Sequence, residues 1–119
     1  MGVAIVTAAL VSVVALGSGH AATTPRLVAT VGPKETISLV DSRGRRVTKL
    51  RRGSYRMVVR DRSARDNFHL FGRSIIGLQG VTSIPARKTV TWNFRLAPGT
   101  YRYRSDAHPR KMRGSFRVV

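Results

Sequence analysis

The clearest hydrophobic pattern in the chain is a strict alternation between residues 89 and 96. Val90, Trp92, Phe94 and Leu96 are apolar, and the residues between them are polar. Because successive side chains of a strand point to opposite faces of a sheet, this spacing predicts a strand with one buried face. Weaker alternation predicts further strands over residues 27–31, 36–40, 55–60, 101–105 and 115–119.

Turn-forming residues separate these segments. Gly and Pro, with small polar neighbours, occur at Gly32-Pro33, Ser42-Arg43-Gly44, Arg52-Gly53 and Ala97-Pro98-Gly99. Short strands at such spacing indicate an all-β fold, a Greek-key β-sandwich. Residues 61–67 and 71–86 lack the alternation and are expected to form irregular crossings between the strands.

Residues 96–103 also fit a tyrosine corner, in which Tyr101 near the start of a strand hydrogen-bonds back to the preceding loop. Such corners occur in immunoglobulin domains, so an immunoglobulin-like module is an alternative. Those domains pair two cysteines across their sheets, whereas this chain has no cysteine. Stability must therefore come from packing, and thiolate chemistry is excluded.

The N-terminal segment differs from the remainder. Residues 3–16 are apolar and uncharged, and small residues follow as far as Ala22. This pattern predicts a secretory signal peptide over residues 1–22, cleaved near Ala21 or Ala22, with an uncleaved membrane anchor as the alternative. Either interpretation places the domain of residues 25–119 outside the cytoplasm, secreted or in the cell envelope.

The chain is strongly basic, with 22 Lys and Arg against 5 Asp and Glu and a formal charge of +17. Such a charge attracts polyanions, and an anionic envelope polymer or an acidic protein is the expected partner. The alternative is a solvated basic surface, because the cations are spread along every strand. We expect no nucleic-acid partner, since no aromatic and basic signature occurs. We expect a monomer, with membrane association only through an uncleaved N-terminal segment.

Two segments resemble those that bind copper in the cupredoxins. They are residues 66–70, Asp-Asn-Phe-His-Leu, and the loop that begins at Ser105 and continues through His108 and Met112. The likeness is to small secreted cupredoxin-like domains of the plastocyanin and EfeO types. It implies His69 as the early histidine ligand. It also implies Ser105, His108 and Met112 in the places of cysteine, second histidine and axial methionine.

The serine changes what the resemblance implies about copper. A blue copper site needs two imidazoles and a thiolate with a weak axial thioether, whereas a serine hydroxyl stays protonated and uncharged. Electron transfer is not expected, and Asp106 is the only local anion that the sequence suggests. Weak copper binding at a degenerate site remains a hypothesis, because His69, His108 and Met112 are ligand types that suit Cu(I). If the ligand geometry survives, Ser105→Cys is predicted to restore a blue site.

Each candidate ligand also has a purely structural interpretation. The two histidines can be neutral and hydrogen-bonded to backbone, and Met112 can fill the core. Catalysis is not expected, because adjacent Ser105 and Asp106 point to opposite sides of an extended chain and cannot both engage one imidazole. Two functions stay open: a secreted copper-binding module and a metal-free basic interaction module of the cell envelope.

Overall fold

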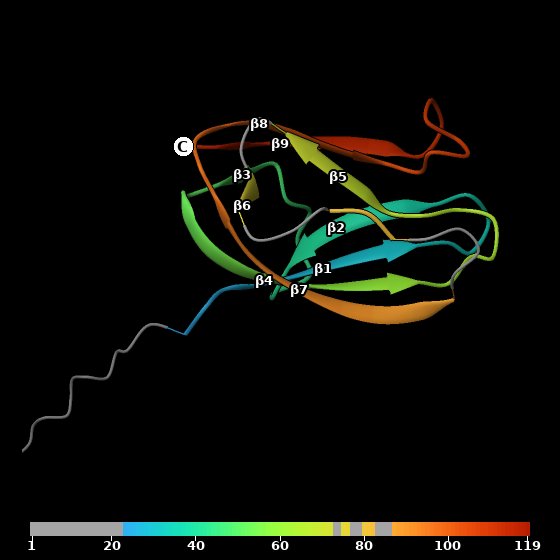
Figure 1. Ribbon diagram of the computed structural model, residues 1–119, viewed down its shortest axis with the longest axis horizontal. Helices are drawn as coiled ribbons and strands as arrows, with labels where there is room; N and C mark the ends of the chain where they lie inside the picture. Colours follow the sequence, from blue (N-terminus) through green and yellow to red (C-terminus); the bar gives the residue numbers. More distant parts are fainter. Residues whose placement is uncertain (1–22, 73–74, 77–79, 83–86) are drawn as a thin grey trace, which may run out of the picture.

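The computed structural model describes residues 23–72, 75–76, 80–82 and 87–119 of the chain (Figure 1). The predicted signal segment, residues 1–22, lies outside the described residues. Within these ranges the chain forms strands and no helix. The strands are β1 (Arg26–Val31), β2 (Ile37–Asp41), β3 (Lys49–Leu50), β4 (Gly53–Asp61), β5 (His69–Gly72), β6 (Ile75–Ile76), β7 (Lys88–Leu96), β8 (Gly99–Arg104) and β9 (Arg113–Val118). No helix in the described part of the chain is long and apolar enough to cross a membrane.

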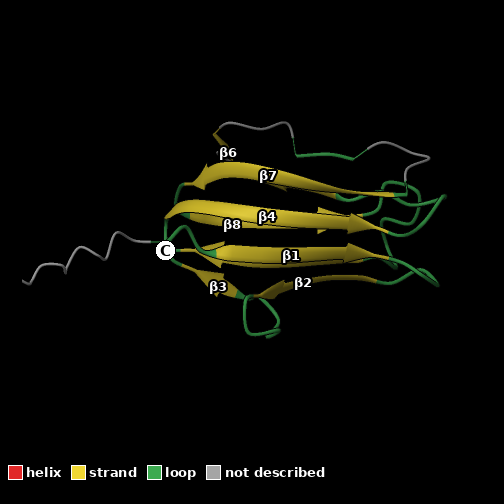
Figure 2. Ribbon diagram, turned by 90° about the horizontal axis from the view of Figure 1, so that it is seen from below, coloured by secondary structure: helices red, strands yellow, loops and turns green. Residues whose placement is uncertain are grey.

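The strands form two sheets packed face to face. One sheet has the order β2-β1-β4-β7-β6 and the other has the order β3-β9-β8-β5. Figure 1 shows the two sheets edge-on, one above the other, and Figure 2 shows the five-stranded sheet from its outer side. The β1–β4 and β3–β9 pairs are parallel and the other pairs are antiparallel. The predicted β-sandwich is confirmed.

The alternating segment forms the long strand β7, as predicted. Phe94 and Leu96 are buried, and Val90 and Trp92 pack against the core from partly buried positions. The other five predicted strands are present, and each end lies within two residues of the prediction. The prediction for residues 71–86 was wrong in part, because this range contains the end of β5 and strand β6.

The core between the sheets is built largely from aromatic and branched side chains. The Phe68 ring lies between Trp92, at 6.0 Å between centroids, and Tyr103, at 5.5 Å. Tyr101 stacks on Phe116 at 5.4 Å. Aromatic pairs at such distances add stabilisation beyond the apolar area that they bury. Phe68 therefore anchors the irregular segment that follows β4 to both sheets.

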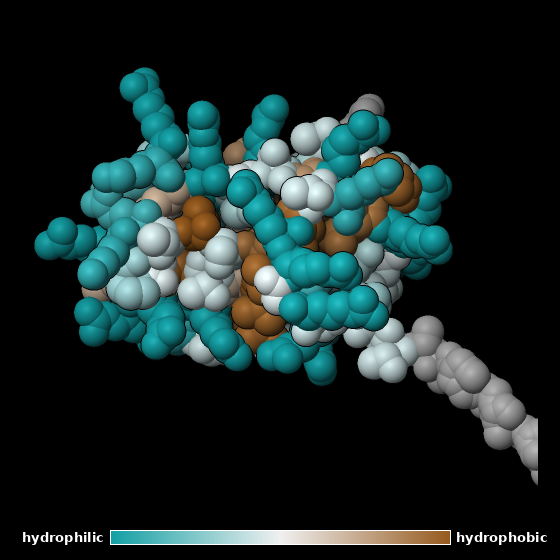
Figure 3. All heavy atoms as spheres, turned by 180° about the vertical axis from the view of Figure 1, so that it is seen from behind, coloured by the Kyte–Doolittle hydropathy of each residue, from teal (hydrophilic) through white to brown (hydrophobic). Residues whose placement is uncertain are grey.

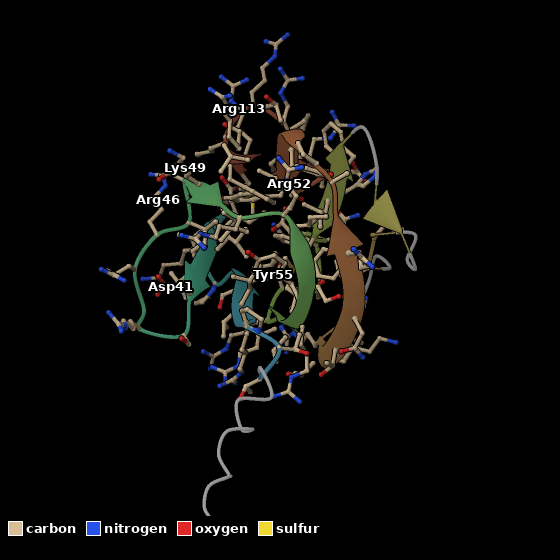
Figure 4. The ribbon with its side chains drawn as sticks, turned by 90° about the vertical axis from the view of Figure 1, so that its left-hand side faces the viewer. Asp41, Arg46, Lys49, Arg52, Tyr55 and Arg113 are labelled. Atoms are coloured by element: carbon tan, nitrogen blue, oxygen red, sulfur yellow. The ribbon has the colours of Figure 1, made fainter. Side chains whose placement is uncertain are left out.

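The predicted tyrosine corner is also confirmed. The Tyr101 hydroxyl donates a hydrogen bond of 2.7 Å to the carbonyl of Ala97, four residues earlier. A second corner, which sequence analysis missed, has the same spacing: the Tyr55 hydroxyl donates to the Arg51 carbonyl at 2.7 Å (Figure 4). Each bond fixes the turn that enters a strand.

Two glycines lie directly opposite two tyrosines of β8. Gly72 on β5 pairs with Tyr101, and Gly114 on β9 pairs with Tyr103. A Cβ atom added at either glycine would lie 2.2 or 2.3 Å from the facing tyrosine ring. The tyrosine rings therefore cross the neighbouring strands where only glycine leaves room. By crossing Gly114, Tyr103 reaches a hydrogen bond with Arg46 at the edge of the sheet.

Candidate functional site

The candidate site lies at the end of the sandwich where β8 leads into β9. The loop between these strands is closed by backbone hydrogen bonds. Ser105 N donates to Met112 O at 3.0 Å, and Met112 N donates to His108 O at 2.9 Å. These bonds hold Ser105 and His108 on one short turn. Their side chains face the irregular segment after β4.

Asp66, in that irregular segment, is the centre of the site. It is 2% exposed. The Ser105 hydroxyl donates to its Oδ1 atom at 2.8 Å, and His108 Nδ1 lies 2.6 Å from the same oxygen. The Ser63 hydroxyl donates to Oδ2 at 2.9 Å. Ser105 and His108 therefore meet at a carboxylate that sequence analysis did not place there.

The charge of Asp66 is set by these contacts. Burial raises the pKa of the Asp66 carboxyl, but the hydrogen bonds from His108, Ser105 and Ser63 outweigh burial, and the pKa is lower than usual. Because an ionised carboxylate only accepts hydrogen bonds, His108 Nδ1 must carry the proton between them. The sequence suggested Asp106 as the only local anion. This is corrected, because Asp66 contacts both Ser105 and His108 directly.

His69 lies in a different environment, on the outer face of the β3-β9-β8-β5 sheet. Its neighbours Phe68 and Leu70 are buried, so alternation along the strand directs His69 outward. His69 Nδ1 is 3.0 Å from Asp106 Oδ1, and Arg104 Nε donates to that oxygen at 3.1 Å. Burial raises the pKa of Asp106, but hydrogen bonds from Asn67, His69 and Arg104 lower it to about 2.

Asn67 joins the two carboxylate clusters. Its backbone N–H points to the Ser105 hydroxyl oxygen at 3.4 Å, and its side-chain amide donates to Asp106 Oδ2 at 2.9 Å. Asp106 N donates in return to Asn67 Oδ1 at 2.7 Å. The same amide reaches the Thr82 carbonyl at 3.3 Å. The buried network is satisfied: in the described residues, no buried side-chain nitrogen or oxygen is left without a partner.

Glu35, in the turn between β1 and β2, covers the site from outside. Its carboxylate lies 3.7 Å from His108 Nε2 and 2.8 Å from Lys111 Nζ. The hydrogen bond and charge of Lys111 lower the pKa of Glu35. Lys34 and Glu35 both have positive φ, 62° and 54°, which non-glycine residues adopt infrequently. The turn therefore holds Glu35 against the loop of His108.

The structure does not gather the four predicted ligands. Ser105 and His108 meet through Asp66, His69 binds Asp106 on the outer face, and Met112 is fully buried in the core. Across the described ranges, no group of three or more His, Asp or Glu side chains can hold a metal ion. The residues present do not fit a type 1 copper site, since its thiolate is absent from the sequence and its imidazoles belong to separate clusters.

Ser105, His108 and Asp66 are not arranged as a Ser-His-Asp triad, in which the serine hydroxyl donates to the imidazole. The Ser105 hydroxyl donates to Asp66 and not to an imidazole, and His108 directs its other nitrogen toward Glu35. The hydroxyl and imidazole are instead two donors to one acceptor.

Sequence analysis missed Asp66 and Asn67 as members of the site. The resemblance pairs their segment, residues 66–70, with the loop of Ser105, but it implies His69, and not Asp66 or Asn67, as the residue that acts with this loop. The position of His69 did have a signal. Phe68 and Leu70 flank it, and this alternation places an intervening side chain on the outer face of a strand.

Comparisons with known proteins identify the fold. No family model matches the sequence, and no curated protein matches it. The structure is similar to Lac15 from a marine microbial metagenome, with a TM-score of 0.51 and 18% identity over 81% of this chain and 32% of that chain. The fold is cupredoxin-like.

Two further solved structures give similar values. A multicopper oxidase has a TM-score of 0.49 and 20% identity, over 78% of this chain and 40% of that chain. The McoA multicopper oxidase 2F4 variant from the hyperthermophile Aquifex aeolicus has a TM-score of 0.49 and 19% identity, over 82% of this chain and 27% of that chain. This cupredoxin-like chain thus spans about a third of each matched protein. At 18% identity, the likeness to Lac15 establishes the fold alone.

Proposed function

We propose that the chain is a cupredoxin-like domain of the cell envelope or the secreted fraction that binds an anionic polymer through its basic surface. In this proposal it is neither an enzyme nor an electron carrier. The apolar segment of residues 3–16 supports a location outside the cytoplasm. The placement of the charges carries the binding function.

All five carboxylates of the chain are engaged in internal contacts. Glu35 binds Lys111, Asp41 binds Arg45, and Asp61 accepts a hydrogen bond from Thr82. Asp66 and Asp106 belong to the candidate site. Few carboxylates are therefore left to neutralise the surplus of 17 positive charges. Figure 3 shows hydrophilic side chains that project from the surface around a central apolar area. Such a surface attracts polyanions.

The contacts of Asp66 support the loss of electron transfer. The Ser105 hydroxyl, which the resemblance puts in the place of the thiolate, donates to Asp66, and the imidazole of His108 does the same. The carboxylate, hydroxyl and imidazole satisfy one another without a metal. The site then serves as a structural link between two loops.

Weak copper binding is the second candidate function. One observation favours it: the Asp66 carboxylate supplies, beside His108, the negative charge that Ser105 lacks. A copper ion there would have to replace the proton on His108 Nδ1. The competing hydrogen bond is 2.6 Å long and charge-assisted, so binding through this pair is expected to be weak.

Retention on an anionic matrix tests the primary proposal. The protein is expected to bind immobilised heparin at physiological salt, to elute at higher salt, and to behave identically with and without a chelator. Exposed charges are screened beyond about 8 Å at that salt, so retention there requires several simultaneous contacts. Elution with the void volume at physiological salt would disprove the proposal.

Calorimetric titration with copper tests the second candidate. Saturable binding that disappears in His108→Ala but persists in His69→Ala would assign it to the pair formed by His108 and Asp66. Loss in both variants would show instead that the two histidines act together. An absence of saturable binding would exclude the copper function.

A further inference from the structure

A groove on the outer face of the four-stranded sheet concentrates the positive charge. It has a volume of about 500 Å³. Four arginines line it, together with two aromatic residues: Arg46, Arg102, Arg104, Arg113, Phe71 and Tyr103. In Figure 4, Arg113 lies at the top of the sandwich and Arg46 lies at the left-hand edge of the view, near Lys49. Within the described residues, Asp106 is the only carboxylate that forms an ion pair with a lining side chain.

The strand register brings two of these arginines into direct opposition. Arg104 on β8 pairs with Arg113 on β9, and Arg102 is two residues before Arg104 on the same face. Facing side chains of an antiparallel pair have Cβ atoms only about 5 Å apart, and like charges at that spacing destabilise the sheet. Asp106 offsets part of the charge of Arg104, and an anion between the two guanidinium groups would offset the remaining repulsion.

Two of the four arginines are held in place before any ligand arrives. The Arg104 guanidinium lies 5.0 Å from the centre of the Phe71 ring and donates to Asp106. Arg46 hydrogen-bonds with the buried Tyr103, whose ring passes over Gly114. Binding groups that are already oriented lose less conformational entropy when they bind. Arg102 and Arg113 are exposed and free to close on a ligand from above.

We propose that this groove binds a linear phosphate polymer, laid across β8 and β9 with its phosphate groups between the arginines. The inference rests on the proposed function and gives it a site and a ligand class. A guanidinium presents a planar fork of donors that can pair with both non-bridging oxygens of a phosphate group, and a linear polymer repeats such groups along its length.

The concave shape favours a chain over a membrane surface. A groove walled by Phe71 and Pro109 admits a narrow polymer, whereas a bilayer surface would contact only the outermost side chains. Arg102 and Arg104 lie on β8 and Arg113 lies opposite Arg104 on β9, so a polymer that crosses the two strands can meet arginines of both.

Binding to long-chain inorganic polyphosphate at physiological salt tests the inference, with fluorescence anisotropy as the readout. The groove variant is Arg102→Gln/Arg113→Gln. Its matched control is Arg56→Gln/Arg60→Gln, which removes the same charge from exposed positions on the other sheet. The groove variant is expected to weaken binding by at least about tenfold and to reduce the salt dependence, and the control by less than about threefold.

A second variant separates charge from geometry. Arg102→Lys/Arg113→Lys keeps the net charge but removes the guanidinium forks. It is expected to bind polyphosphate less tightly than the unchanged protein and more tightly than the glutamine variant. Circular dichroism melting of each variant verifies that the sandwich is intact, and only folded variants enter the comparison.

The outcomes distinguish this inference from the broader function. Equal weakening in the groove and control variants would overturn the groove while leaving polyanion binding in place. Equal affinity for polyglutamate of the same charge would overturn the phosphate class, and tighter binding to phosphatidylglycerol vesicles would favour a membrane ligand instead. Failure to bind any of these probes would reject the proposed function itself.

Discussion

Asp66 and His108 are joined by a hydrogen bond of 2.6 Å between Oδ1 and Nδ1, and the Ser105 hydroxyl donates to the same oxygen. One carboxylate thus takes both groups that the loop between β8 and β9 presents. The buried carboxylate of Asp66 therefore links this loop to the irregular segment after β4.

Replacement of Asp66 tests that link. Asp66→Asn is expected to lower the free energy of unfolding by about 2 kcal/mol, because the amide keeps an acceptor but loses the charge that strengthens hydrogen bonds from three donors. Urea denaturation measures the change. Asp41→Asn is the matched control, since Asp41 is more exposed and accepts backbone N–H groups that an amide oxygen also accepts. Equal losses in both variants would contradict a special role for Asp66.

Acid should weaken the fold through Asp106. Its pKa in the folded protein is lowered from 3.8 to about 2. Because the folded value lies below the unfolded one, the carboxylate stabilises the protein fully above pH 3.8, and that stabilisation is lost as the pH falls through about 2. Urea midpoints measured between about pH 2 and 6 should fall with acid, and Asp106→Asn should fall less steeply. Parallel slopes would show that Asp106 does not contribute.

The structure changes the expectation for a restored copper site. Ser105→Cys alone is expected to give no blue protein, because His69 lies on the outer face and Asp66 occupies the position beside the new thiol. The double variant Ser105→Cys/Asp66→His places a thiolate and two imidazoles together, with Met112 nearby on the same loop. Copper titration followed by visible absorption measures both. A blue colour in the single variant would show that His69 reaches the site after all.

The glycine opposite Tyr103 gives a prediction about packing. Gly114→Ala is expected to cost about 1–3 kcal/mol, because the new methyl group would overlap the tyrosine ring and the strand would have to shift. Thermal unfolding measures the loss. In a Tyr103→Leu background the same change should cost less, because the facing ring is gone. An unchanged cost would mean that the glycine matters for its backbone alone.

The fold could be predicted from local patterns in the sequence, and the contacts within the site could not. Alternation predicts six strands, and the corner at Tyr101 follows from its distance to Ala97. The strands β3 and β6 contain two residues each, which is too short for a periodic signal. The residues that meet Ser105 come from a segment with no periodicity at all, and their position depends on how Phe68 packs between Trp92 and Tyr103.

The four hydrogen bonds of Asn67 have an implication for motion at this end of the sandwich. One amide residue holds the segment after β4, the stretch near Thr82 and the turn after β8. If one of these three backbone segments moved away alone, Asn67 would lose a hydrogen bond and leave a buried polar atom without a partner. Any molecule that docks here would therefore meet a single rigid platform, and its arrival would have to be accommodated by its own flexibility.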